Sequence, residues 1–181
     1  NFIQYSTIYI GQDLNIKRQL LHSNISCGGY VTVQDHTEKR GAIFGGVLNA
    51  IKGVRTVNLG ATSGVKTIVN LAGSYNRLIK YKDSLYESLE KIKKALETSN
   101  SALKKLNNIQ PTTDKNKLQE YKELSSRLHA SIQGYEQKKM ETTNNIQLTQ
   151  DKIQTYMNET SLHVSNSIFN NVLIKIGCHM L

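Results

Sequence analysis

Glycine-centred turns recur every seventeen residues near the start of the chain, and they constrain the fold more than any other feature. The turns are Gly11-Gln12, Gly28-Gly29 and Gly45-Gly46. On both sides of the turns, apolar and polar residues alternate, as in Ile25-Ser26-Cys27 and Val31-Thr32-Val33, which is the pattern of a strand with one buried face. A single unit of this size cannot bury its apolar face alone and must stack on its neighbours. The repeat therefore predicts a β-solenoid with about 17 residues per coil.

The alternation also predicts which side chains lie inside the solenoid, which we assign to residues 1–73. The expected interior positions are Ile8, Ile10, Leu14, Ile16, Ile25, Cys27, Val31, Val33, Phe44 and Leu48. Cys27 is expected to be a small buried hydrophobic side chain, and no disulfide with Cys178 is predicted. Six glycines are expected to serve backbone turns rather than to contact a ligand. They are Gly28, Gly29, Gly45, Gly46, Gly60 and Gly64.

From Tyr75 onward, the spacing of apolar residues changes to alternating steps of three and four. The positions are 85, 89, 92, 96, 99, 103 and 106, and then 118, 121, 125, 128, 132, 135, 139, 142, 146, 149, 153 and 156. Most of them are apolar, but Ser99, Ser125, Lys139 and Thr142 interrupt the series. This heptad seam on two segments predicts paired helices. Because Pro111 interrupts helical structure, the two segments should fold back as a long antiparallel coiled-coil hairpin inserted over residues 74–165, with its turn near 107–114.

After the helical insertion, residues 166–181 return to strand composition. Val172, Ile174 and Ile176 alternate with Leu173 and Lys175, which predicts a strand that rejoins the solenoid. The chain begins without methionine in an apparent strand and ends just after another. We therefore expect it to be an excised fragment of a longer protein.

Two glycine-containing motifs carry a resemblance to a known family. Residues 43–50 read IFGGVLNA, residues 59–67 read LGATSGVKT, and a helical hairpin and the closing strand follow. This order resembles the C-terminal part of the bacterial flagellar assembly protein A family over nearly the whole chain. The resemblance implies a bacterial cytoplasmic protein linked to flagellar assembly and polar flagellation, with recruitment to the cell pole as an expectation. It also implies that the N-terminal region of the family is absent from this chain.

The net charge of +9 raises the question of a nucleic-acid partner. Residues 1–73 carry seven Lys/Arg and three Asp/Glu, whereas residues 74–165 carry fifteen and eleven. The excess is thus spread thinly and mixed with acidic residues, as on a solvated helix surface. Lys91, Lys93 and Lys94 form the densest cluster, and no aromatic residues alternate with them to stack bases. The prediction is a solvated surface, with docking of an acidic protein as the alternative and nucleic acid disfavoured.

No motif in the sequence predicts catalysis, a cofactor or a metal. Gly60 to Thr67 departs from the phosphate-binding loop, because three residues separate its glycines and Val65 comes before Lys66. That segment is interpreted as a turn before the strand that begins near Ile68. The histidines lack the spacing of metal ligands, and no serine or histidine has an evident catalytic partner. No apolar run approaches the roughly 20 residues of a membrane span.

Three classes of function remain after these exclusions. The first is a non-catalytic scaffold that binds other proteins, including acidic regulatory or flagellar components. The second is a polymer-forming or division-site β-solenoid that acts by self-assembly, with a homo-oligomer formed through the coiled coil or the solenoid. The third, an acyltransferase of the left-handed β-helix type, conflicts with the seventeen-residue repeat. Leu124 and Leu148 lie outside the predicted seam. They are the candidate contacts of the helices with a second protein, together with Lys91, Lys93 and Lys94. The alternative is that the two leucines pack against the first helix or the solenoid.

Overall fold

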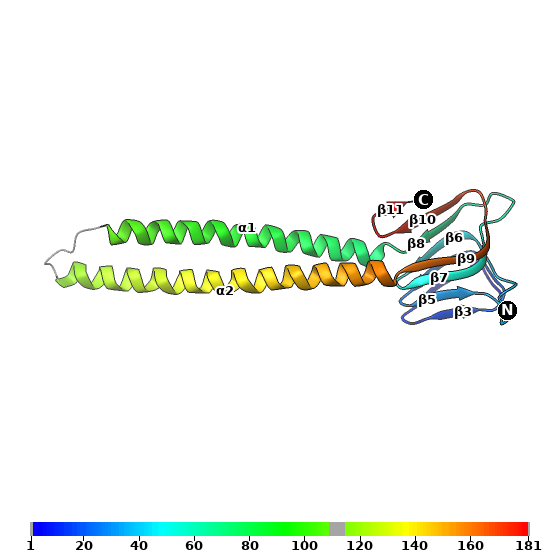
Figure 1. Ribbon diagram of the computed structural model, residues 1–181, viewed down its shortest axis with the longest axis horizontal. Helices are drawn as coiled ribbons and strands as arrows, with labels where there is room; N and C mark the ends of the chain where they lie inside the picture. The colour runs from blue at the N-terminus through cyan, green and yellow to red at the C-terminus, as the bar shows by residue number, and fades with distance from the viewer. Residues whose placement is uncertain (1, 109–114, 181) are drawn as a thin grey trace. The chain divides into compact units, whose positions relative to one another are not determined.

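The protein consists of short β-strands interrupted by two long helices (Figure 1). The structure, a computed structural model, describes residues 2–108 and 115–180, so the predicted turn near 107–114 lies largely outside the described residues. Two compact units result, one formed by Asn1–Ile79 with Lys152–Leu181 and the other by Lys80–Asp151. The elements are β1 (Phe2–Gln4), β2 (Thr7–Ile10), β3 (Leu14–Ile16), β4 (Gln19–Cys27), β5 (Tyr30–Val33), β6 (Ala42–Ala50), β7 (Gly53–Leu59), β8 (Thr67–Asn70), α1 (Gly73–Asn107), α2 (Lys115–Glu159), β9 (Ser161–Ile168), β10 (Val172–Ile176) and β11 (His179–Met180).

The strands of the first unit stack in parallel as three ladders, which we name A, B and C. Each coil of the chain contributes a strand to ladder A, then to ladder B, then to ladder C. The lists that follow give one residue per coil, and each residue pairs with the next one in its list. Ladder A runs Phe2, Gln19, Ala42, Asn58, Ser167; ladder B runs Thr7, Asn24, Val47, Ile68, Leu173; ladder C runs Leu14, Val31, Val54, Leu162. Only β11 pairs antiparallel, against β10, among the strands that the structure describes.

The step from coil to coil is not constant. Leu14 pairs with Val31, the predicted step of seventeen, but Val31 pairs with Val54, a step of twenty-three. The six additional residues lie in the connection from ladder C to ladder A, which spans residues 34–41 in the second coil and only residues 17–18 in the first. The prediction of a constant seventeen-residue coil is therefore wrong at the third coil, and Gly45-Gly46 is not equivalent to Gly28-Gly29.

One hydrophobic core unites the inward side chains of all three ladders. Its buried members are Ile16, Leu20, Ile25, Cys27, Val31, Val33, Ile43, Leu48, Ala50, Val54, Leu59, Val69, Leu71 and Ile174. Most predicted interior positions are in this cluster, and Ile8 and Leu14 pack against it while half-buried. Each inward apolar side chain that leaves water contributes roughly 1.5–3 kcal/mol to folding, so the core is the main source of stability of this unit.

Two predicted interior residues lie outside this core. Ile10 is half-buried and is not among the residues that pack against the core. Phe44 is the second. It is half-buried, and its ring meets His22 edge-on at a centroid distance of 5.7 Å. The core position in that strand is Ile43, which is 2% exposed and pairs with the equally buried Leu20. The prediction was wrong because the seventeen-residue alignment shifted the third coil against the second.

Residues with positive φ mark the corner between ladders A and B. Tyr5, His22 and Gly45 occupy this corner in successive coils, with φ of 50°, 45° and 72°. The rings of Tyr5 and His22 stack at 5.2 Å with an interplanar angle of 13°. A Cβ on Gly45 would lie 2.5 Å from Nδ1 of His22, so a side chain there would meet the imidazole.

In the helices, the predicted seam positions are the least exposed ones. All are buried or half-buried except Leu118 and Lys139, and Leu96, Leu106 and Ile146 are at most 9% exposed. Hydrogen bonds between described residues join the helices: Tyr121 Oη donates to Asn107 Oδ1 at 3.2 Å, and Gln150 Nε2 donates to Tyr86 Oη at 3.3 Å. The partners of these bonds show that α1 and α2 run antiparallel.

The chain returns to the ladders earlier than the sequence predicted. Strand β9 begins at Ser161, within the segment 74–165 assigned to the helical insertion. It pairs with β7 in ladder C through Leu162 and in ladder A through Ile168. Most of its exposed positions are occupied by polar residues, Ile168 is 55% exposed, and its inward Leu162 and Val164 are only half-buried. This explains why its apolar pattern is weak. The predicted closing strand is β10.

Candidate functional site

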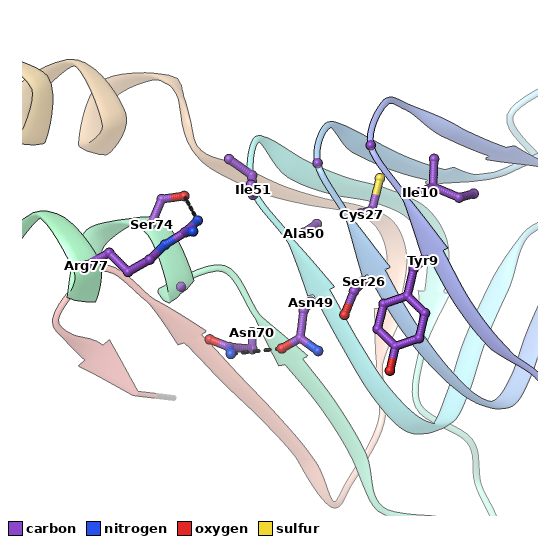
Figure 2. Close-up of a pocket in the computed structure, with 13 residues that line it drawn as sticks. Tyr9, Ile10, Ser26, Cys27, Asn49, Ala50, Ile51, Asn70, Ser74 and Arg77 are labelled. Carbon is purple, nitrogen blue, oxygen red and sulfur yellow. Dashed lines mark hydrogen bonds between the residues drawn. The ribbon is translucent and has the colours of Figure 1, made fainter.

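A groove of about 450 Å³ follows the outward face of ladder B (Figure 2). Four side chains from successive coils form its wall, because residues paired across a parallel ladder stack on the same face. They are Tyr9, Ser26, Asn49 and Asn70. The remaining lining residues come from the corner between ladders B and C and from the first turn of α1: Ile10, Gly11, Cys27, Gly28, Ala50, Ile51, Gly73, Ser74 and Arg77.

The asparagine side chains along this wall bond to one another and to the main chain of the solenoid. Asn70 Nδ2 donates to Asn49 Oδ1 at 2.9 Å, and Asn49 Nδ2 donates to the carbonyl of Ile25 at 3.4 Å. The Asn70 Oδ1 atom in turn accepts the main-chain N–H of Ala72 at 3.1 Å. This short asparagine ladder ties neighbouring coils together. The groove therefore offers an outside ligand chiefly the ring of Tyr9, which is 80% exposed, and the guanidinium of Arg77.

Sequence reasoning did not identify this groove. Its wall residues are separated by steps of seventeen, twenty-three and twenty-one along the chain, as the pairs Tyr9–Ser26, Ser26–Asn49 and Asn49–Asn70 show. No constant period connects them. The recurrence of Asn at two outward positions was the only signal, and it becomes visible only when the register is known.

Some predicted turn glycines lie where a side chain would collide with a neighbouring coil, and others also have a positive φ. Gly28 and Gly29 lie at the corner between ladders B and C, where a Cβ on Gly28 would collide with the carbonyl oxygen of Gly11 and one on Gly29 with the carboxylate of Asp13. Gly46 has a φ of 87°, and a Cβ there would collide with the carbonyl oxygen of Ser23.

The segment from Gly60 to Thr67 forms a turn that leads into β8. Gly60 and Gly64 have φ of 84° and 68°, the left-handed region that side chains disfavour. Gly64 N donates to the carbonyl of Ala61 at 3.0 Å, and Asn171 Nδ2 donates to the carbonyl of Gly64 at 2.8 Å. The predicted strand after this turn is confirmed as β8.

On the helices, the candidate contact residues are on the surface. Leu124 is 49% exposed and Leu148 is 56% exposed. Lys91, Lys93 and Lys94 are exposed as well, and Lys93 Nζ pairs with Glu90 Oε1 at 2.7 Å. This contact lowers the pKa of Glu90, first through the hydrogen bond and then through the charge of Lys93.

Both cysteines are free thiols, as expected. Cys27 is buried, and its Sγ donates to the carbonyl of Gln12 at 2.9 Å. Cys178 is exposed beside Tyr75, and desolvation followed by the hydrogen bond with Cys178 raises the pKa of the Tyr75 phenol. Within the described residues, no three His, Cys, Asp or Glu side chains gather as a metal site.

Comparison with known families decides the relationship of the chain. The model of the Flagellar Assembly Protein A beta solenoid domain matches residues 1–181. The chain belongs to this family. No curated protein and no solved structure matches it. Membership identifies the stacked parallel ladders as a β-solenoid domain and the chain as a flagellar assembly-related protein. Neither helix, over its described residues, has the length and apolar character needed to cross a membrane.

Proposed function

We propose that this chain is a non-catalytic interaction module of a flagellar assembly protein, in which a β-solenoid carries an antiparallel coiled-coil hairpin and both present surface to other proteins. The observation that carries the proposal is the exposure of Leu124 and Leu148 on α2. The seam between the helices is formed by other residues, so these two leucines are not needed to pair α1 with α2.

The position of Leu148 on the heptad supports a contact with a second molecule. Leu148 lies two residues after the buried seam residue Ile146, and Met140, which is 62% exposed, lies one residue after the exposed Lys139. In a heptad these are outer positions, opposite the seam. Two turns of helix separate Leu148 from Met140, or roughly 12 Å. Leu124 flanks the seam one residue before Ser125.

A binding role rather than a catalytic one fits the groove on ladder B. Its asparagines are committed to hydrogen bonds within the solenoid, and the thiol of Cys27 is buried and bonded to a carbonyl. Neither arrangement pairs a nucleophile with a base, which catalysis by activated side chains requires. We further propose that the chain acts in the bacterial cytoplasm, with which membership of a flagellar assembly family is compatible, and that it is recruited to the cell pole.

A deletion tests the role of the helices without damaging the ladders. We would remove Lys80–Asp151, which form a compact unit of their own, and join Ile79 to Lys152 by a short glycine-serine linker. This boundary keeps β9 intact. The expected result is a folded solenoid by circular dichroism that no longer binds a purified flagellar partner of the full chain.

Point substitutions sharpen the same test in the full chain. The double variant Leu124→Ser with Leu148→Ser should bind the partner more weakly at unchanged thermal stability, since both side chains are exposed. The matched control is Ser131→Ala with Gln133→Ala, two other exposed positions of α2. If the deletion protein keeps its oligomeric state and every partner, the helices have no recognition role.

A further inference from the structure

A second hollow, of about 380 Å³, lies where the chain passes from ladder C to ladder A. Three cationic side chains line it: Arg18 from the connection after β3, and Lys39 and Arg40 from the longer connection after β5. We call these three residues the basic corner. The hollow is completed by Gln19, Gly41, Ala42 and Asn58.

The twenty-three-residue register brings the two basic segments together. Gln19 pairs with Ala42, and Ala42 N donates to the carbonyl of Arg18 at 3.0 Å. Arg18 therefore lies beside the residues that immediately precede Ala42. With a constant seventeen-residue step, Arg18 would instead have matched Asp35 in the next coil.

The acidic residues of the loop are engaged in hydrogen bonds rather than in salt bridges with the basic corner. Asp35 Oδ1 accepts hydrogen bonds from Thr37 Oγ1 and from the main-chain N–H groups of Lys39 and Arg40, at 2.9, 3.1 and 3.3 Å. Glu38 Oε1 accepts one from Gln34 Nε2 at 3.3 Å. Across residues 2–108 and 115–180, the salt bridge that forms is Lys93–Glu90. The three cations thus share one hollow without a paired carboxylate.

The same hydrogen bonds hold the basic corner in a defined shape. Asp35 N donates to the carbonyl of Arg40 at 2.8 Å, which closes the loop, and Glu38 N donates to the carbonyl of Asp35 at 3.1 Å. Desolvation is the largest single influence on the pKa of Asp35 and raises it. The hydrogen bonds from the Thr37 side chain and from the main chain of Arg40, Lys39 and Thr37 together outweigh desolvation, so the net pKa lies below its usual value. Asp35 stays ionised and keeps the main chain under Lys39 and Arg40 in place at neutral pH.

Neutral hydrogen-bond donors add to the cationic ones. Asn58 Oδ1 accepts a bond from Asn166 Nδ2 at 2.9 Å, while Asn58 Nδ2 has no partner in the part of the chain that the structure describes. The side-chain amide of Gln19 is likewise without one there. An oxyanion in the hollow would meet two guanidinium groups, an ammonium group and amide N–H donors.

We propose that the basic corner is a docking site for a carboxylate-rich segment, an Asp/Glu-containing stretch of a protein partner. The proposal rests on the interaction role proposed above and names the chemistry of a partner on the solenoid. Guanidinium groups bind carboxylates with two parallel hydrogen bonds and lose little hydration when they do so. A site fixed before binding also avoids the entropy cost of ordering a loop.

The lining residues argue against other anionic partners. None of them is aromatic, so the hollow has no surface on which bases of a nucleic acid would stack. No large apolar side chain lines it either, whereas binding to a membrane surface combines basic clusters with apolar insertion. A helix N-terminus is a common backbone site for phosphate, and none of the residues that line the hollow belongs to one.

The experiment uses the full chain and a short fluorescein-labelled peptide of alternating Glu and Ser, with its Gln counterpart as the reference ligand. Fluorescence anisotropy at low salt should show binding of the Glu peptide only. The double variant Arg18→Gln with Arg40→Gln should weaken binding about tenfold, equivalent to about 1.4 kcal/mol. The matched control, Lys52→Gln with Lys66→Gln, removes the same charge from exposed positions of the same unit and should change affinity less than about twofold.

Three results would overturn the proposal. The first is that the Glu peptide does not bind, and the second is that both double variants weaken its binding equally. The third is that the protein binds a phosphopeptide, single-stranded DNA or anionic vesicles more tightly than the Glu peptide, and that this binding requires the basic corner. The variant Leu124→Ser with Leu148→Ser should bind the peptide normally. If that variant loses a protein partner but still binds the peptide, the helix surface and the basic corner act independently. Partner binding therefore tests the proposed role of the helices, and peptide binding tests the basic corner.

A substitution at Asp35 distinguishes a shaped site from attraction by net charge. Asp35→Ala makes the protein more positive, so attraction by charge alone would strengthen peptide binding. Loss of the bonds to Lys39 N and Arg40 N should instead weaken it several-fold at an unchanged midpoint of thermal unfolding of the core. Tighter binding in Asp35→Ala would contradict a preorganised corner.

Discussion

The helices and the ladders differ in how far along the chain their contacts reach. In α1 and α2, each heptad repeats the same local rule, and the positions expected to pair are less exposed along most of both helices. In the ladders, the partner of a residue depends on the length of every connection before it. The first step was predicted as seventeen, but the second became twenty-three because one loop is longer. The heptad spacing within a helix does not depend on loop lengths elsewhere in the chain, whereas the pairing register of the ladders changes when one loop is longer.

The two regions also differ in how completely they bury their apolar residues. Val31, Val33 and Val54 in ladder C are 0% exposed, whereas the best-buried seam residues of the helices retain several per cent of their surface. Two helices can cover each other only along one stripe, while three ladders enclose a core. Substitutions should therefore cost more stability in the ladders than at equivalent apolar positions in the helices.

The largest effect is expected for a charge in the ladder core. Val31→Asp places an unpaired carboxylate among buried side chains and should destabilise the solenoid by about 4 kcal/mol or more, measured by urea unfolding followed by circular dichroism. The control is Thr32→Asp, whose half-buried side chain is adjacent in the strand and pairs with Arg55 in the ladder. Equal losses in both variants would show that the alternation of β5 is misassigned.

Glycines should respond in opposite directions in the two regions. Gly46→Val forces a side chain into a φ of 87° and against the Ser23 carbonyl, and should cost about 3 kcal/mol. In α2, a Cβ on Gly134 meets no atom within 4 Å, so Gly134→Ala should stabilise the helices by about 0.5–1 kcal/mol. The measurement is the midpoint of thermal unfolding of each variant. Shifts of the same sign in both variants would contradict the prediction.

Truncation of a seam leucine should have an intermediate effect. Leu96 is 9% exposed, so Leu96→Ala should lower the stability of the helical unit by about 2 kcal/mol. The exposed Leu148 serves as the comparison, and Leu148→Ala should stay within about 0.5 kcal/mol. The loss of helical signal on heating is the measurement. A large effect of Leu148→Ala would indicate that α2 packs through a second face.

The smallest effect on stability is expected when the two coil steps are made equal. Deletion of residues 35–40 joins Gln34 to Gly41, which correspond to Lys17 and Arg18 in the preceding coil. The ladders should keep their pairing, with a change below about 1 kcal/mol because the cost of loop closure varies slowly with length. Binding of the Glu peptide should disappear with Lys39 and Arg40. An unfolded product would show that the Asp35 hydrogen bonds set the register of the third coil.

Much of the architecture could be predicted because it depends on local patterns. Alternation around Gly28-Gly29 identified β4 and β5, the heptad spacing identified α1 and α2, and Val172 to Ile176 marked the closing strand β10. The order of these segments also sufficed for the resemblance to the flagellar assembly protein A family. These features repeat within a few residues, so each could be recognised without its tertiary partner.

The register of the third coil and the surfaces that depend on it were decided only by the tertiary structure. Ile43 rather than Phe44 faces the core because the loop between β5 and β6 contains six additional residues. The same offset places Arg18 beside Lys39 and Arg40, and it brings Asn49 beside Ser26 along the groove. The physical reason is that a loop adds little free energy whatever its length, whereas pairing and core burial select the register. That selection depends on contacts between distant residues, which no local period in the sequence records.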